Sequence, residues 1–264
     1  MKLVSMKLVS MKLVTLKVLL LAVILLALPC WAGRSFNGST DHTTVSGVGN
    51  AIDLTGSAGT WSCWFNLPSL PASGNSYSCM GKTTATWSGG YAFFIQSTGV
   101  ISFFFYINIS LNHSHTVACS TTVTTGHWHN AVAVYQNNVD ARIYLDGTQC
   151  GIDSGVGTTG SLVTSGLSLL LGGQLQSWAP CCTNLGSLGE IAIWNVRLSP
   201  GQIQALANVC PAGASARRMG FPPPVGYWPM TGASGSSIEP DFSGNVLNAT
   251  LSGTAAANHP PCTP

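Results

Sequence analysis

The sequence predicts an all-β protein, folded as a two-sheet antiparallel β-sandwich. Short runs rich in Val, Ile, Phe, Thr and Trp recur between clusters of Gly, Ser and Asn, a pattern typical of sandwich strands and their turns. Before Ser199 no stretch has the periodicity of an amphipathic helix of ordinary length. Without a predicted leader of 32 residues, 232 residues remain, enough for two sheets to bury one large core.

Residues 1–32 are predicted to be a secretory signal peptide, cleaved after Ala32. A basic segment precedes an uncharged run over 18–32, which is shorter than the roughly 20 residues of a membrane span. The alternatives are an uncleaved anchor or a lipid anchor on Cys30. Because MKLVS and MKLVT repeat in tandem, three methionines are candidate starts: Met1, Met6 and Met11. We expect a secreted mature chain, 33–264, that forms one domain and has no membrane span.

Loss of the leader changes the charge balance. Four of the ten Lys and Arg residues lie in the leader, which leaves six basic against eight acidic residues, a net charge of about −2. Arg217-Arg218 is the only pair of adjacent basic residues left, so nucleic acid is not a predicted partner. The surface must then consist largely of Ser, Thr, Asn, Gly and Gln. Such a surface hydrogen-bonds neutral ligands such as sugars, although many secreted β-proteins share it.

The strands can be placed in order along the chain. Residues 61–67 alternate between two faces, as a half-buried strand does. Residues 91–96 and 101–107 flank Ser-Thr-Gly and predict a hairpin. Residues 131–136 and 141–145 predict a second hairpin, which is followed by a tight turn at Asp-Gly.

One short helix is expected near residues 199–207. Ser199 has the hydroxyl of an N-cap, and Pro200 suits the first helical position. Ile203 and Leu206 then fall on one apolar face.

Eight cysteines remain in the mature chain, and this even number in a secreted protein predicts four disulfides. Their order suggests the local pairs Cys63–Cys79 and Cys119–Cys150, because each pair brackets a predicted hairpin. The remaining partners stay open, since eight cysteines allow 105 pairings. The eight are Cys63, Cys79, Cys119, Cys150, Cys181, Cys182, Cys210 and Cys262.

The predicted strands resemble the motifs of laminin-G-like domains in the concanavalin A-like lectin/glucanase superfamily. Residues 186–206, GSLGEIAIWNVRLSPGQIQAL, resemble the family's closing strand and helix, although Gly189 stands where an acidic residue is usual. The resemblance implies a jelly roll and covers about residues 36–206. Further motifs occur in the family's order: FNGSTD at 36–41, GTWSCWF at 59–65, GK and GYAF at 81–82 and 90–93, WHNAV at 128–132, IYLDG at 143–147 and LLGG at 170–173.

The C-terminal segment, residues 222–264, resembles the family's first-strand motif, which in most members precedes the FNG motif. We expect it to dock as the completing strands of a laminin-G-like jelly roll. Tyr227, Trp228 and Leu251 would be buried by this docking. The alternative is a separate tail that follows the proline linker at 222–224.

No catalytic constellation is apparent. Glucanases of this fold carry nucleophile and acid carboxylates on one strand. The mature chain has only two glutamates, Glu190 and Glu239. Glu190 has no carboxylate two or four positions away, and Glu239 is separated from Asp241 by Pro240, which interrupts an extended segment. His127 and His129 flank Trp128 at the family's WHHVA-like motif, where packing and hydrogen bonding are expected rather than metal binding. The chain is therefore not predicted to be an enzyme.

The resemblance does imply two kinds of binding residue. Jelly-roll lectins often bind calcium, which takes 6–8 oxygen ligands. The candidate calcium ligands lie in motif loops that would meet if the C-terminal strand docks beside Phe36: Asp241, Asn245, Asp41 and Asn37. Trp87 and Trp178, in Gly/Ser/Pro-rich loops, are candidates for stacking on sugar rings, and the alternative is that they cap those loops.

The predicted function is a secreted, non-catalytic binding module for carbohydrate or glycoprotein, in adhesion or recognition. It depends on analogy at the level of the fold. The alternative is a secreted structural or matrix subunit that self-associates. A glycoside hydrolase comes third, because the carboxylate motif is absent.

Overall fold

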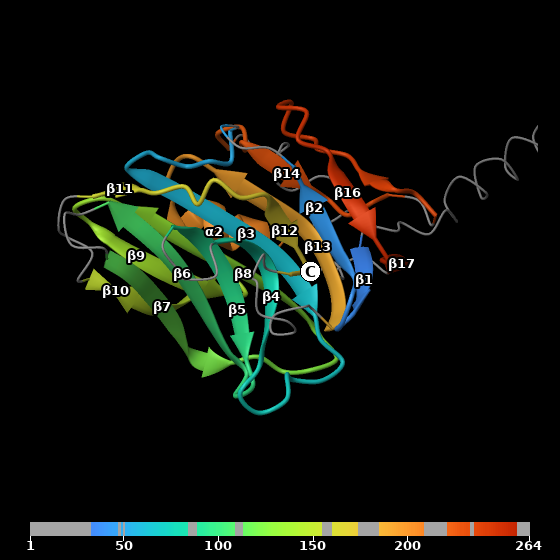
Figure 1. Ribbon diagram of the computed structural model, residues 1–264. Helices are drawn as coiled ribbons and strands as arrows, with labels where there is room; N and C mark the ends of the chain where they lie inside the picture. Colours follow the sequence, from blue (N-terminus) through green and yellow to red (C-terminus); the bar gives the residue numbers. More distant parts are fainter. Residues whose placement is uncertain are drawn as a thin grey trace, which may run out of the picture. The chain divides into compact units, whose positions relative to one another are not determined.

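The computed structural model shows two antiparallel sheets packed face to face, with a short helix beside one of them (Figure 1). The predicted all-β sandwich is confirmed. The leader, residues 1–32, lies outside the described residues, and no helix within the described ranges is long and apolar enough to cross a membrane. The structure describes residues 33–46, 49, 51–83, 89–108, 113–154, 160–173, 185–208, 221–232 and 235–257.

Sheet A has the strand order β10-β9-β8-β3-β13-β1-β17, and β14 pairs with β13 beyond the end of β1. The predicted hairpin at 131–145 is its β8–β9 pair. The strands of sheet A are β1 (Gly33–Asn37), β3 (Ala58–Asn66), β8 (Trp128–Gln136), β9 (Asp140–Leu145), β10 (Thr148–Asp153), β13 (Leu185–Trp194), β14 (Gly226–Trp228) and β17 (Ala255–Ala257).

Sheet B has the order β11-β6-β5-β4-β12-β2-β16-β15, and β7 pairs with β6. The predicted hairpin at 91–107 is its β5–β6 pair. The strands of sheet B are β2 (His42–Val45), β4 (Ser76–Thr83), β5 (Gly90–Gln96), β6 (Val100–Asn108), β7 (His113–Thr122), β11 (Ser161–Leu162), β12 (Leu169–Leu171), β15 (Ile238–Glu239) and β16 (Ala249–Ser252).

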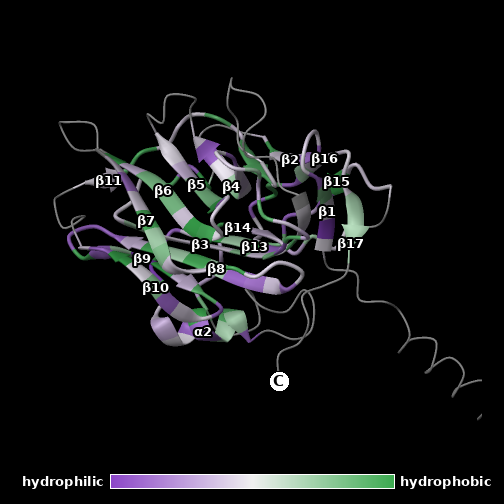
Figure 2. Cartoon of the chain, turned by 90° about the horizontal axis from the view of Figure 1, so that it is seen from below, coloured by the Kyte–Doolittle hydropathy of each residue, from purple (hydrophilic) through white to green (hydrophobic). Residues whose placement is uncertain are grey.

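The core lies between the sheets, because alternate residues of each strand point inward. Phe103 of β6 packs against Phe93 of β5 and Trp61 of β3, with ring centroids 4.8 and 4.6 Å away. Phe105 reaches Tyr135 of β8 at 5.1 Å. Figure 2 shows hydrophobic residues along strands such as β3 and β6. Each large side chain buried in this way contributes ~1.5–3 kcal/mol, so the aromatic residues provide much of the attraction between the sheets.

The C-terminal segment supplies strands to both sheets. In sheet A, β14 pairs with β13 and β17 with β1, while in sheet B β16 pairs with β2 (Figure 1). Tyr227 and Trp228 are buried, and the indole N–H of Trp228 donates to the Leu247 carbonyl at 2.8 Å. Leu251 is half-buried. The described part of this segment is therefore integral to the sandwich.

The predicted helix is α2, Pro200–Ala207, with Ser199 as its N-cap. The Ser199 hydroxyl accepts from the Gln202 amide, and the Gln202 side chain accepts from the Ser199 amide, which completes a capping box. Ile203 and Leu206 face sheet A, where they join a second hydrophobic cluster.

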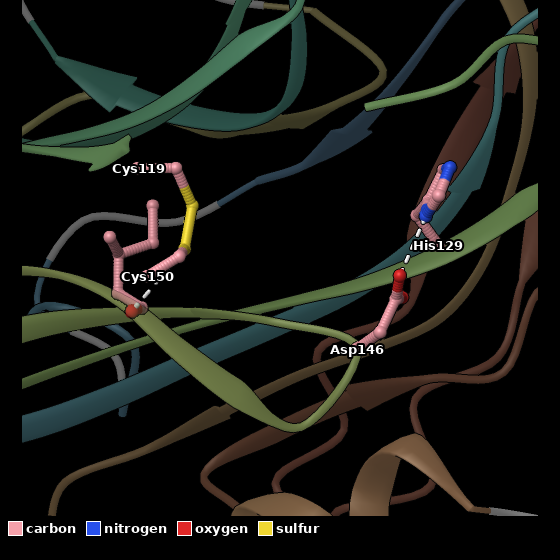
Figure 3. Close-up of a disulfide and its surroundings, with 5 residues drawn as sticks. Cys119, His129, Asp146 and Cys150 are labelled. Atoms are coloured by element: carbon pink, nitrogen blue, oxygen red, sulfur yellow. Dashed lines mark hydrogen bonds and ion pairs between the residues drawn. A yellow bond between two sulfur atoms is a disulfide. The ribbon is translucent and has the colours of Figure 1, made fainter. Parts of the chain in front are cut away.

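Both open edges of the sandwich are joined across the sheets. At one edge, the disulfide Cys119–Cys150 links β7 of sheet B to β10 of sheet A (Figure 3), as predicted. The strands approach so closely there that a Cβ at Gly151 would lie 2.1 Å from the Ala118 carbonyl oxygen. At the other edge, Arg34 of β1 forms an ion pair with Glu239 of β15, with Nε–Oε2 2.9 Å and both side chains fully buried.

Candidate functional site

The outer face of sheet A is occupied by the protein itself. Val134, Trp194 and Tyr227 project from its strands and are buried together with Ile203 and Leu206 of α2. The Trp194 indole N–H donates to the Pro222 carbonyl at 3.0 Å, so the chain at Pro222 is also held against this face. This part of sheet A therefore offers little free surface to a ligand.

The outer face of sheet B lacks a helix within the described ranges. One row of paired residues crosses this face from β15 to β7, and it is exposed at its two ends and buried in the middle. In order, the row is Ile238, Thr250, Thr44, Leu170, Gly81, Ala92, Phe104 and Thr116.

The β7 end of this row combines exposed polar side chains with aromatic rings. Ser114 and Thr116 are exposed on β7, opposite Tyr106 and Phe104 of β6. Phe94 of β5 joins the two rings in a small apolar cluster, in which each ring is 6–8% exposed. We call this surface, with Gln96, the β5–β7 face.

No charged side chain of β5–β7 points outward on the β5–β7 face. The outward residues of these strands are Ala, Phe, Gln, Ser, Tyr and Thr, while His115 lies on the core side, stacked on Phe105. The Gln96 amide donates to Ser102 Oγ at 2.9 Å and so orders the polar edge of the face. Hydroxyl and amide groups beside rings suit a neutral polar ligand better than an ionic one.

Two of the predicted calcium ligands lie in the turn between β1 and β2. Asn37 Oδ1 accepts from the backbone amides of Ser39, Thr40 and Asp41, and Asp41 Oδ2 accepts from the Asn37 amide at 3.0 Å. These bonds form a self-contained Asx-type turn. Both side chains therefore already serve the local backbone.

The other two predicted ligands lie in residues 240–248, between β15 and β16, which we call the Asp241 loop. Asp241 Oδ1 accepts from the amides of Tyr227 (3.0 Å) and Ser243 (2.8 Å). Its Oδ2 accepts from Ser243 Oγ (2.7 Å) and the Leu247 amide (2.9 Å). Asn245 donates to the Val225 carbonyl at 3.0 Å. The carboxylate thus organises the loop around itself.

These two pairs of residues do not come together. Asp41 precedes β2 and Asp241 precedes β16, and the two strands are antiparallel, so their starts lie at opposite ends of the pair. Within the described ranges, no three His, Cys, Asp or Glu side chains converge as a metal site. The four residues do not fit one calcium ion, which needs 6–8 oxygens.

Some of the remaining predicted site residues lie outside the described residues, and others lie within them. Trp87 and Trp178 lie outside the described residues, as do Cys181, Cys182, Cys210 and Cys262. His129 holds a structural position, with Nδ1 2.8 Å from Asp146 Oδ2 (Figure 3).

The suggested bridge between Cys63 and Cys79 is not formed in the structure. Both cysteines carry free thiols, buried in the core between β3 of sheet A and β4 of sheet B. The pKa of Cys63 is raised by its burial and by the neighbouring Cys79. The two thiols are nevertheless neighbours across the sandwich, so the sequence paired the right residues although no bond joins them in the structure.

Sequence reasoning missed two features near these positions. The first is Phe242, an aromatic side chain that follows Asp241 and is 42% exposed. From this motif only the polar residues Asp241 and Asn245 were candidates for binding. The second feature is an ion pair: Asp53 Oδ1 lies 2.6 Å from Nζ of the fully buried Lys82. The signal in the sequence was Lys82 itself, the single charged residue of β4.

Known proteins with similar sequences match a limited part of the chain. It is 29% and 28% identical, over 107 residues, to the rat and mouse forms of a protein named for its sushi, von Willebrand factor type A, EGF and pentraxin domains. The match covers 38% of this chain and 3% of either relative. The whole activity of those large proteins is therefore not transferred.

Solved structures extend the likeness to most of the fold. A candidate carbohydrate-binding protein from Bacteroides ovatus superposes with a TM-score of 0.60 at 15% identity, over 88% of this chain and 61% of the other. The heptameric SAP-like pentraxin of Limulus polyphemus gives 0.57 at 14% identity, over 90% of this chain and 100% of the other. The family model described as the concanavalin A-like lectin/glucanases superfamily matches residues 37–204, more than half of the sequence, and the chain belongs to that superfamily.

Proposed function

We propose that the mature chain is a secreted, non-catalytic module that binds neutral carbohydrate, free or on a glycoprotein, through the β5–β7 face. One observation carries the proposal. Of the two outer faces, that of sheet A is covered in part by α2, whereas that of sheet B ends in uncharged hydroxyl and amide groups beside aromatic rings. Such a surface can exchange hydrogen bonds with sugar hydroxyls without burying a charge.

Further support comes from the leader and from the similar proteins. The predicted signal peptide would place the domain outside the cell, where adhesion or recognition takes place. The protein from Bacteroides ovatus is described as a candidate carbohydrate-binding protein, and lectins give the superfamily part of its name.

A binding role without catalysis agrees with the contacts of the two glutamates. Glu190 accepts a hydrogen bond from the Tyr227 hydroxyl at 2.7 Å. Glu239 is paired with Arg34 and accepts from the amides of Thr231 and Gly232. Both carboxylates are buried in structural contacts, so neither is positioned as the nucleophile or acid of a glycosidase.

The test is glycan binding by residues 33–264, first on a glycan array and then by calorimetry with the best neutral glycan. Thr116→Arg places a bulky charge on the β5–β7 face and should weaken binding at least about tenfold. Thr148→Arg, at an exposed threonine of β10, is the matched control and should bind like the parent protein. Equal binding by both variants would refute the assignment of this face.

The same titrations, repeated with calcium and with a chelator, test whether calcium takes part in glycan binding. Because the four candidate ligands are divided between two loops, we expect the glycan affinities measured with calcium and with the chelator to agree within about twofold. A loss of binding on chelation would show that glycan binding depends on calcium.

The predicted alternative, a self-associating matrix subunit, is favoured by one observation, the heptameric assembly of the similar pentraxin. Sedimentation equilibrium of the mature protein separates the two functions. Growth into large assemblies without any glycan partner would support the matrix subunit.

A further inference from the structure

The Asp241 loop presents apolar side chains on a rigid support. Phe242 is 42% exposed and Val246 is 79% exposed. Val246 also has a φ of 58°, a conformation that a β-branched residue rarely adopts. An exposed apolar residue in a strained conformation gains nothing for the fold, and such strain concentrates at functional sites.

Hydrogen bonds within the protein hold the Asp241 loop in place. The four hydrogen bonds accepted by the Asp241 carboxylate hold Ser243 and Leu247 in place, and the Phe242 amide donates to the Tyr227 carbonyl at 2.8 Å. The rings of Phe242 and Tyr227 meet edge to face, 6.4 Å apart. The orientation of Phe242 is thus set before any ligand arrives.

The loop carries no free charge. Both oxygens of Asp241 are engaged by the loop, and Glu239 is fully buried against Arg34. An ion would therefore find no partner here, whereas an uncharged ligand could approach without desolvating a charge.

Two side-chain amides of the same loop, those of Asn245 and Asn248, each keep one polar atom outside these bonds. Asn245 uses its Nδ2 on the Val225 carbonyl, so its Oδ1 is turned away from that bond. Asn248 uses its Oδ1 to accept from the Asp241 amide, which leaves its Nδ2 as a donor. Both side chains are exposed. One acceptor, one donor and an aromatic ring match a sugar, whose hydroxyls both donate and accept and whose C–H face is apolar.

We propose that the Asp241 loop is a second ligand site, which takes one ring of a neutral pyranoside. The apolar face of the sugar lies against Phe242 and Val246, while its hydroxyls donate to Asn245 Oδ1 and accept from Asn248 Nδ2. The site is separate from the β5–β7 face, but it depends on the same ligand class as the proposed function. A chain with both sites contacts a branched glycan at two points.

The experiment uses the mature protein from a host without N-glycosylation, because Asn248-Ala-Thr is a glycosylation sequon. The probes are the methyl glycosides of glucose, galactose, mannose and N-acetylglucosamine, detected by saturation-transfer NMR and titrated individually. Phe242→Ala should weaken one of these glycosides about tenfold, the effect of one lost aromatic contact. Ile152→Ala removes an equally exposed apolar residue from β10 and should change nothing.

Thr116→Arg separates the two proposals. If it leaves the Phe242-dependent signal unchanged, the Asp241 loop binds sugar independently of the β5–β7 face. If Phe242→Ala has no effect while Thr116→Arg abolishes binding, the second site is refuted and the proposed function stands. If the parent protein binds none of the four glycosides, the Asp241 loop is refuted, and the array decides the proposed function.

Sedimentation of the parent protein and of Phe242→Ala tests whether the Asp241 loop binds a second copy of the chain instead of a sugar. A dimer that forms without sugar and is lost in Phe242→Ala would show that the loop contacts a second copy, which overturns the sugar assignment.

Discussion

Lys82 places a positive charge inside the sandwich, where burial would be costly without a partner. Asp53 supplies that partner and also accepts from Thr164 Oγ1 at 2.5 Å, while Lys82 donates to the Leu167 carbonyl. Burial alone would raise the pKa of Asp53, but Lys82 and the hydrogen bonds bring it below its usual value. The Asp53 carboxylate therefore stays ionised at neutral pH, and its ion pair with Lys82 fastens the segment before β3 to β4.

His129 makes part of the stability dependent on pH. Burial alone would lower the pKa of His129, but the hydrogen bond and charge of Asp146 and the Thr124 carbonyl raise it above its usual value. A raised folded pKa means that the stabilisation is fully present below the unfolded value of about 6.5 and is lost as the pH rises through the folded value. His129→Gln should therefore lose more stability at pH 5.5 than at pH 8.5.

The loss at low pH should be ~0.2–1 kcal/mol, because Asp146 is half exposed. For a domain of this size it corresponds to a Tm lower by roughly 1–4 °C in calorimetry. Asp146→Asn is less suitable as a test, since Asp146 Oδ1 also accepts from the Asn130 amide. A larger loss at pH 8.5 than at pH 5.5 would contradict this account.

The thiols of Cys63 and Cys79 should be chemically silent in the folded protein. Both are at most 1% exposed, and the raised pKa of Cys63 keeps it protonated. We expect iodoacetamide to leave both unmodified in native protein and to alkylate both after unfolding without reductant, as measured by peptide mass spectrometry. Failure to alkylate either peptide after unfolding would show that the two are oxidised.

At the scale of elements, the C-terminal strands should be indispensable. Truncation after Ala216 removes β14 to β17, so that β1, β2 and β13 each lose a paired neighbour and Trp228 leaves the core. The expected product aggregates or is unfolded by circular dichroism. Truncation after Ala257 removes no described strand and is the control for chain length. A cooperative melt of the shorter chain within a few degrees of the parent would show that residues 217–264 are a tail.

Local pattern was enough to predict β3, β5, β6, β8 and β9, the Asp146-Gly147 turn and α2 with its Ser199 cap. These features depend on alternation and on capping, which involve residues close in sequence. The four calcium candidates do not meet, because their meeting required the starts of β2 and β16 to coincide, and strand direction cannot be determined from the motifs. Phe242 and the Lys82–Asp53 pair were missed because burial and exposure depend on partners far away in the chain.

At the scale of the whole molecule, the two linked edges should contribute unequally. Replacing Cys119 and Cys150 together by Ala should cost ~2–4 kcal/mol, mainly through a less constrained unfolded chain. Arg34→Met leaves Glu239 buried without its partner and should cost ~3–5 kcal/mol. Denaturant unfolding of each variant measures both values.

The double variant Arg34→Met/Glu239→Leu removes both charges, and so tests whether the unpaired carboxylate causes the loss of stability. It should recover part of the loss, because no unpaired charge remains, but the amides of Thr231 and Gly232 lose their acceptor. A double variant less stable than Arg34→Met would contradict the view that the unpaired carboxylate causes the damage.

The Arg34–Glu239 pair also has a consequence for the order in which the chain can assemble. Its partners are 205 positions apart, and β1 lies between β13 and β17, the last of which ends at Ala257. During synthesis the first strand therefore emerges long before either neighbour exists. Such distant pairings slow folding, and they leave an unpaired strand edge exposed to other chains in the meantime. A domain built this way closes only after nearly all of it has left the ribosome.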